Sequence, residues 1–198
     1  MNVPAELPSR FDLSGRVAVI TGGAGLLGPR HANAIASAGG IPVLVDLHRD
    51  RAESHAVRLQ ATHGVPAMGL GADITSESAV EAMLAEVLVR YGRVDILVNN
   101  AANNPKVEDA GSVAFSRLEH FPLKQWEADV AVGLTGAFLC SQIVGRELAR
   151  RGRGTIINIS SEYGMIAPDQ RLYRQEGVPE EQQPVNIADG LQCFAAPR

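Results

Sequence analysis

The length, composition and charge of the chain are those of one globular domain. Its 198 residues are enough to bury a substantial core, and 45% of them are hydrophobic and 20% charged. The formal net charge of −4 gives no indication of a nucleic-acid partner. Residues 1–15 contain no basic segment followed by an apolar one, so we expect no signal peptide, and no apolar run approaches the ~20 residues of a membrane span. The cysteines and histidines show no ligand spacing, which predicts no metal site and a reduced, cytoplasmic setting.

Short apolar runs alternate with helical patterns from residue 17 to residue 159. Strands are predicted at residues 17–20, 41–46, 65–72, 94–98 and 154–159. Helices are predicted at residues 26–38, 51–62, 76–91 and 123–150. This alternation with short connections predicts an α/β fold with a doubly wound parallel sheet. We expect a single domain over residues 1–198, with a polar loop at 103–122 and an irregular segment at 168–198.

The glycine-rich turn after the first strand is the most informative stretch. It lies between a strand and a helix, and Gly23, Gly25 and Gly28 match the pattern G-x-G-x-x-G. Such glycines allow a tight turn, a close approach of the backbone to a pyrophosphate, and close packing of helix on strand. Free N–H groups at the helix start then face the phosphates. The turn predicts a dinucleotide site, with an ordinary strand-to-helix turn as the alternative. The expected contacts are Gly22, Gly23, Gly25, Leu26, Leu27 and Gly28.

Two aspartates follow the second and third strands. Asp46 lies 18 residues beyond Gly28, where a carboxylate accepts hydrogen bonds from the adenosine ribose. Its charge repels the 2′-phosphate of NADP, which favours NAD as the cofactor, unless Arg49 or Arg51 meets that phosphate instead. The alternative for Asp46 is a turn or helix-capping residue. Asp73 is expected either beside the adenine or in a plain turn.

Several motifs, in the expected order, resemble the short-chain dehydrogenase/reductase family. They lie within residues 9–165 and are Thr21–Gly28, Asp46, Asp73-Ile74, Val98–Ala102, Leu134–Phe138 and Asn158–Ser161. The resemblance implies a Rossmann-type fold, a nicotinamide cofactor and hydride transfer to or from the hydroxyl or carbonyl group of a small molecule. It also places Asp73, Ile74, Asn100, Ala101 and Ala102 along the cofactor. The alternative for Asn99 and Asn100 is that they satisfy backbone groups at a strand end.

The resemblance assigns only part of the family's catalytic set. Ser161 matches the serine that holds the substrate oxygen, although a strand-end hydroxyl is the alternative. Tyr173 lies near the family distance for the acid tyrosine, but Gly177 stands where its lysine is expected. Gly133 occupies the position of the helix asparagine. The chain contains no Y-x-x-x-K, and its two lysines both precede Ser161.

The C-terminal part of the sequence departs from the family. Residues 167–174 resemble a subgroup with an insert between the serine and the tyrosine, a subgroup that hints at sugar or polysaccharide metabolism. The expected Y-S-x-x-K does not follow Pro184-Val185, so we hypothesise a frameshift or truncation near residue 186. Without the family's C-terminal helices and strands, the fifth strand becomes an exposed edge, which predicts a poorly soluble or partner-dependent product.

Two classes of function are compatible with these motifs. The first is an NAD-dependent oxidoreductase acting on a hydroxyl or carbonyl group. The alternative is a catalytically inert dinucleotide-binding module or a fragment, since the tyrosine–lysine pair and the asparagine are missing. Helices 76–91 and 123–150 resemble those of the family's dimer contact. We therefore expect a homo-oligomer or a pairing with a complete paralogue.

Overall fold

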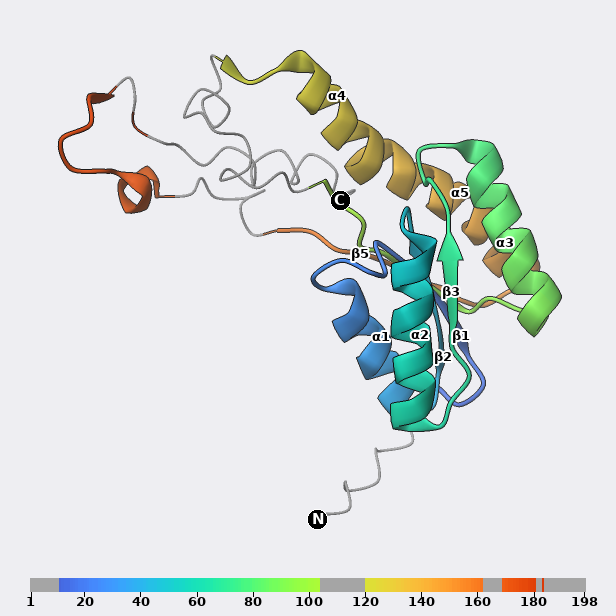
Figure 1. Ribbon diagram of the computed structural model, residues 1–198. Helices are drawn as coiled ribbons and strands as arrows, with labels where there is room; N and C mark the ends of the chain where they lie inside the picture. Colours follow the sequence, from blue (N-terminus) through green and yellow to red (C-terminus); the bar gives the residue numbers. More distant parts are fainter. Residues whose placement is uncertain (1–10, 104–119, 162–168, 181–182, 184–198) are drawn as a thin grey trace, which may run out of the picture. The chain divides into compact units, whose positions relative to one another are not determined.

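The computed structural model describes residues 11–103, 120–161, 169–180 and 183 (Figure 1). The chain divides into two units. The first contains residues 1–101 and 138–157, and the second contains residues 102–137 and 158–198.

A five-stranded sheet forms the centre of the fold. Its strands are β1 (Val17–Thr21), β2 (Ile41–Asp46), β3 (Met68–Gly71), β4 (Ile96–Asn99) and β5 (Thr155–Asn158). Their order in the sheet is β3-β2-β1-β4-β5, and the pairings of β1 with β2, β1 with β4 and β2 with β3 are parallel. All five residues of β1 are buried, as expected for a central strand covered on both faces. The predicted parallel sheet is confirmed.

Helices cover both faces of this sheet (Figure 1). On one face, α1 (Gly28–Ser37) and α2 (Arg49–His63) pack with small side chains against Ile20, Leu44 and Val98. These small residues are Ala32, Ala36, Ala52 and Ala56. On the other side lie α3 (Glu77–Tyr91) and α5 (Ala137–Arg150) (Figure 1). The arrangement is the predicted doubly wound one, and the alanines let α1 and α2 approach the sheet closely.

The predicted helix at residues 123–150 is continuous but not uniform. It runs as α4 (Leu123–Val130), a π-helical segment η4 (Ala131–Gly136) and then α5. The π segment contains Gly133 and ends at Gly136, and glycine disfavours the regular α-helix. The predicted helix over residues 123–150 is confirmed, with π-helical winding at residues 131–136. Within residues 168–198, expected to lack regular structure, the short 3₁₀ helix η6 spans Gln170–Tyr173.

The helix Leu123–Arg150 is also long and apolar enough, by length and composition alone, to cross a membrane. Its most apolar window has a mean hydropathy of 1.4, and 22% of that window is buried. We had expected no segment to meet this test. The inward face of α5 belongs to the core, through Cys140, Ile143, Val144 and Leu148. A core helix of a soluble protein passes the same test, so the finding is only a weak indication of a membrane.

The strand β5 lies at the edge of the described sheet, and its residues are exposed. Ile156 is 37% exposed and Ile157 44% exposed. The expectation that the fifth strand forms an exposed apolar edge agrees with these values. The predicted low solubility stays a prediction.

A buried carboxylate joins the amino-terminal ends of the strands. Asp95, only 5% exposed, accepts the Val17 N–H at 2.9 Å and the Arg93 guanidinium at 2.7 and 2.5 Å. The Asp95 backbone N–H donates to the Val17 carbonyl oxygen, and the Asp95 carbonyl oxygen accepts the Thr155 N–H. Burial by itself raises the pKa of the Asp95 carboxyl, but the hydrogen bonds from Arg93 and the Val17 N–H outweigh burial and hold that pKa below its ordinary value.

We expect the Asp95→Asn variant to lose about 2–3 kcal/mol of unfolding free energy at pH 7, because a buried N–H and a guanidinium lose their charged acceptor. The folded-state pKa lies below the ordinary value of 3.8, so this stabilisation is complete above that value and is lost as the pH falls through it and below. Urea unfolding at pH 7 and at lower pH measures both effects.

Asp169→Asn serves as the control, because its ion pair with Arg171 is exposed and should contribute much less. Equal losses from the two variants at pH 7 would contradict the role given to Asp95.

Candidate functional site

The turn between β1 and α1 packs so closely that its glycines leave no room for side chains. Gly22 has a φ of +63°, and a Cβ on it would lie 2.9 Å from the Cα of Ala101. A Cβ on Gly23 would lie 2.6 Å from the Cβ of Leu44. A Cβ on Gly28 would lie 2.2 Å from the carbonyl oxygen of Gly22. The turn is therefore held against β2, against the segment after β4 and against the start of α1.

Gly25 and the two leucines after it face outward. Within 4 Å, a Cβ on Gly25 would meet only the Gly22 carbonyl oxygen, which lies 3.3 Å away. Leu26 is 89% exposed and Leu27 48% exposed. Within the described residues, the N–H groups of these leucines have no hydrogen-bond partner, and no side chain caps α1. Exposed donors at the positive end of a helix dipole suit a phosphate group, so this turn fits the predicted pyrophosphate.

Asp46 lies at the end of β2 and is bonded directly to the glycine turn. One carboxylate oxygen accepts the Ala24 N–H at 3.0 Å, and the other accepts the His48 N–H at 3.1 Å. Asp46 is thus in part the turn residue of the alternative interpretation. A carboxylate has about four acceptor sites, so two backbone bonds leave capacity for ribose hydroxyls. The structure brings the predicted acid and the predicted phosphate donors together in one place.

Hydrogen bonds between β1 and β4 hold the turn from the other side. The Thr21 hydroxyl accepts the N–H groups of Asn100 at 3.0 Å and Ala101 at 3.1 Å. The Asn100 side-chain amide donates to the carbonyl oxygens of Thr21 at 2.9 Å and Gly22 at 3.2 Å. Asn99 donates to the Ser141 hydroxyl at 2.9 Å. Asn100 therefore satisfies backbone groups, as the alternative predicted, and also positions the glycine turn, whereas the Asn99 amide bonds a side-chain hydroxyl of α5.

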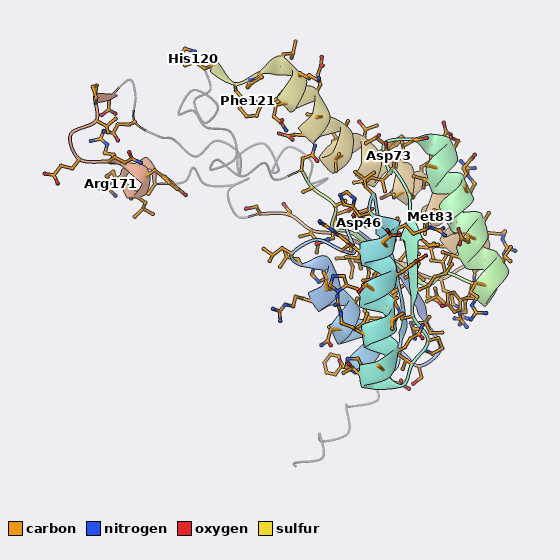
Figure 2. The ribbon with its side chains drawn as sticks, in the orientation of Figure 1. Asp46, Asp73, Met83, His120, Phe121 and Arg171 are labelled. Carbon is orange, nitrogen blue, oxygen red and sulfur yellow. The ribbon has the colours of Figure 1, made fainter. Side chains whose placement is uncertain are left out.

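Asp73 occupies a turn between β3 and α3. Its carboxylate accepts the Thr75 N–H at 2.9 Å and the Thr75 hydroxyl at 2.7 Å. Figure 2 shows Asp73 and Asp46 at the same end of the sheet, where its parallel strands end. The next residue, Ile74, is only 7% exposed. Asp73 has the bonding of a turn aspartate, and an adenine contact by Asp73 or Ile74 stays a prediction.

The two catalytic candidates lie in the second unit. Ser161 follows β5 by three residues, and Tyr173 is the last residue of η6. Gly133, at the family's asparagine position, lies in the π-helical segment of the same unit. Ala102, predicted along the cofactor, is also the first residue of this unit after Ala101. The residues brought together around the turn belong to the first unit, and the catalytic roles of Ser161 and Tyr173 stay predictions.

Two contacts near the turn were not anticipated from the sequence. The Thr21 hydroxyl accepts the N–H groups of Asn100 and Ala101, the two residues that follow β4, and Arg49 pairs with Glu86 of α3. The threonine carried a weak signal in the sequence, because it directly precedes the glycines. In the structure it is 1% exposed. Nothing local marks the Arg49–Glu86 pair, since its partners lie 37 residues apart.

Comparisons with known proteins agree with this geometry. Residues 16–173, most of the chain, match the family model described as short chain dehydrogenase. A D-threitol dehydrogenase of Mycolicibacterium smegmatis is 33% identical over 87% of this chain and 63% of its own length. An NAD-dependent glycerol dehydrogenase of Listeria innocua is 30% identical over 82% of this chain and 59% of its own length.

A similar solved structure is that of an NAD⁺-bound xylitol dehydrogenase, with a TM-score of 0.75 and 26% identity. The match covers 92% of this chain and 61% of that one. The chain thus spans about three fifths of the length of these relatives. From the family match and the shared parallel sheet with its glycine turn, we conclude that the chain belongs to the short-chain dehydrogenase family.

Proposed function

We propose that the protein is an NAD-dependent oxidoreductase acting on the hydroxyl or carbonyl group of a small molecule. The observation that carries this proposal is the Asp46 carboxylate bonded to the Ala24 N–H, beside the N–H groups of Leu26 and Leu27, which have no partner among the described residues. In this arrangement the turn binds the pyrophosphate and Asp46 accepts the ribose hydroxyls. When bound, the nicotinamide ring accepts or donates the hydride.

The preference for NAD over NADP follows from the charge at the end of β2. A 2′-phosphate on the ribose would lie against the Asp46 carboxylate, and two negative groups repel each other strongly where water is partly excluded. The listeria relative is named an NAD-dependent enzyme and the xylitol dehydrogenase was solved with NAD⁺, which supports the same preference here.

The proposed substrates are small polyols and their carbonyl forms. Three similar proteins are named for such compounds, D-threitol, glycerol and xylitol. Short-chain polyols offer a secondary alcohol, whose carbon gives its hydride to the nicotinamide ring while its hydroxyl gives a proton to a base, so that the carbonyl forms. The protein must then supply a group that takes the hydroxyl proton and a group that holds the oxygen.

Ser161 and Tyr173 are the residues we propose for these two roles. The Ser161 hydroxyl would hold the substrate oxygen by a hydrogen bond, and the Tyr173 phenol would exchange the proton with it. In the family a lysine four residues after the tyrosine assists this exchange, and Gly177 stands at that position here. We therefore expect slow turnover by these 198 residues compared with the relatives.

An inert dinucleotide-binding module remains a second candidate. It is favoured by one observation, the lack of any Y-x-x-x-K sequence in the chain. Such a module would bind the cofactor through the same turn and Asp46 without turning over substrate. We propose a cytoplasmic protein for either function, and self-association or pairing with a complete paralogue through the helix at residues 123–150. Leu134 is 42% exposed and Phe138 57% exposed on that helix.

We expect the Asp46→Asn variant to bind NADH about tenfold more weakly than the wild type, because a charged acceptor of the ribose hydroxyls is lost. It should bind NADPH more tightly, because the charge that repels the 2′-phosphate is removed. Titration of NADH and NADPH fluorescence measures both affinities. Asp50→Asn removes the same charge from the first turn of α2 and should leave both affinities nearly unchanged. A folded wild-type protein that ignores millimolar NADH would refute the proposal.

We expect the Tyr173→Phe variant to lose at least about 100-fold of the turnover while NADH affinity is unchanged, because the proton-transfer group is removed. Initial rates of NADH formation with threitol, glycerol and xylitol provide the measurement. Tyr91→Phe on α3 is the matched control and should keep wild-type turnover. If Tyr173→Phe turns over like the wild type, Tyr173 is not the acid. If the wild type binds NADH but converts no polyol or carbonyl compound, the inert module is the better description.

A further inference from the structure

The end of β2 carries a cation as well as the carboxylate of Asp46. Arg49 is the first residue of α2, three residues after Asp46. Asp46 pairs with Gly71 in the sheet, and a Cβ on Gly71 would lie 2.9 Å from the Cβ of Arg49 and 3.6 Å from its Nε. The Arg49 side chain therefore runs across the end of β3, over the residue that is the direct neighbour of Asp46.

Two carboxylates from different helices hold the guanidinium of Arg49 there. Its Nη2 lies 3.4 and 3.5 Å from the carboxylate oxygens of Glu86 on α3. Its Nη1 lies 3.7 Å from an oxygen of Glu53, one turn along α2. All three side chains are about half exposed, so each pair contributes little to stability. Together, however, two negative charges surround one positive charge, and the net charge around the guanidinium is negative.

This arrangement bears on which dinucleotide the site accepts. The 2′-phosphate of NADP extends from the ribose that Asp46 contacts, and dehydrogenases that use NADP place an arginine nearby to accommodate it. Arg49 begins in the right place for this role. Its guanidinium is directed across the end of β3 to Glu86 on α3, and a phosphate would have to compete with two carboxylates for it.

We propose that Glu86 and Glu53 withhold Arg49 from the 2′-phosphate and so make Arg49 a latent NADP ligand. The discrimination against NADP then has two parts, the charge of Asp46 and the occupation of the nearest arginine by other acids. This inference rests on the proposed function, because it requires the ribose to lie at Asp46. It assigns a specificity role to Glu86, a residue of α3 outside the dinucleotide motif.

The test measures equilibrium binding of NADH and NADPH to the full chain by fluorescence titration. We expect Glu86→Gln to tighten NADPH binding roughly three- to tenfold and to leave NADH binding unchanged, because the freed guanidinium can pair with the phosphate. The double variant with Glu53→Gln should tighten NADPH binding further. High salt should reduce both gains, since the residues are exposed. Glu81→Gln, an exposed acid on the same helix, is the matched control and should change neither affinity.

Arginine variants identify the cation responsible. Arg49→Ala should not change NADPH binding in the wild type but should abolish the gain in the Glu86→Gln background. Arg51→Ala should leave that gain intact. The inference is overturned if Glu86→Gln binds NADPH no better than the wild type while NADH still binds, or if Arg51 accounts for the gain. If neither dinucleotide binds to the folded wild type, the proposed function fails and the inference fails with it.

Discussion

At the carboxyl ends of β1 and β4, the Thr21 hydroxyl accepts the N–H groups of Asn100 and Ala101, and the Asn100 amide donates to the carbonyl oxygens of Thr21 and Gly22. These four bonds join β1 to the segment after β4, beyond the last paired residues of the two strands, and they hold Gly22 in its left-handed conformation. The rest of the site follows from that position. Gly28 can approach Gly22 only when the turn is so tightly folded, and α1 then begins with its first N–H groups facing outward.

A second consequence is the balance of charge beside the turn. The helix dipole and the N–H groups of Leu26 and Leu27 favour an anion at the turn. The Asp46 carboxylate, which accepts the Ala24 N–H of the same turn, disfavours an anion beside it. A dinucleotide with a phosphate bridge and an uncharged ribose matches this pattern of donors and acceptors. A nearby arginine matters for the same reason, because a cation available at this edge would favour a ribose that carries a 2′-phosphate. Arg49 is paired with Glu86 and Glu53 instead.

The helix at residues 123–150 changes its winding along its length. Residues 131–136 take the π form, and α5 continues with a face of buried residues. π-helical turns inside α-helices are frequent at functional sites. Here the π segment includes Gly133, the position that the family resemblance assigns to an asparagine.

Local patterns in the sequence were sufficient for the elements and for the kind of ligand. Apolar runs located the strands, because a strand buried on both faces must be apolar throughout, and β2 ends at Asp46 as predicted. The turn glycines and Asp46 pointed to a dinucleotide, since each acts through its own backbone or charge. Helix ends were less well placed: α2 begins at Arg49 rather than 51, because no side chain caps it and so no local signal marks its start.

Only the tertiary structure decided which residues hold the site in place. Asn100 reaches Thr21 across 79 positions, and Arg49 reaches Glu86 across 37, and no local pattern encodes such pairs. The steric roles of the glycines also depend on the fold, because Gly22 meets Ala101 after β4 and Gly23 meets Leu44 of β2, while Gly25 stays open. The sequence by itself determined the order of elements, the glycine turn and its acid. The fold decided their partners, because those contacts form only when distant strands and helices pack side by side.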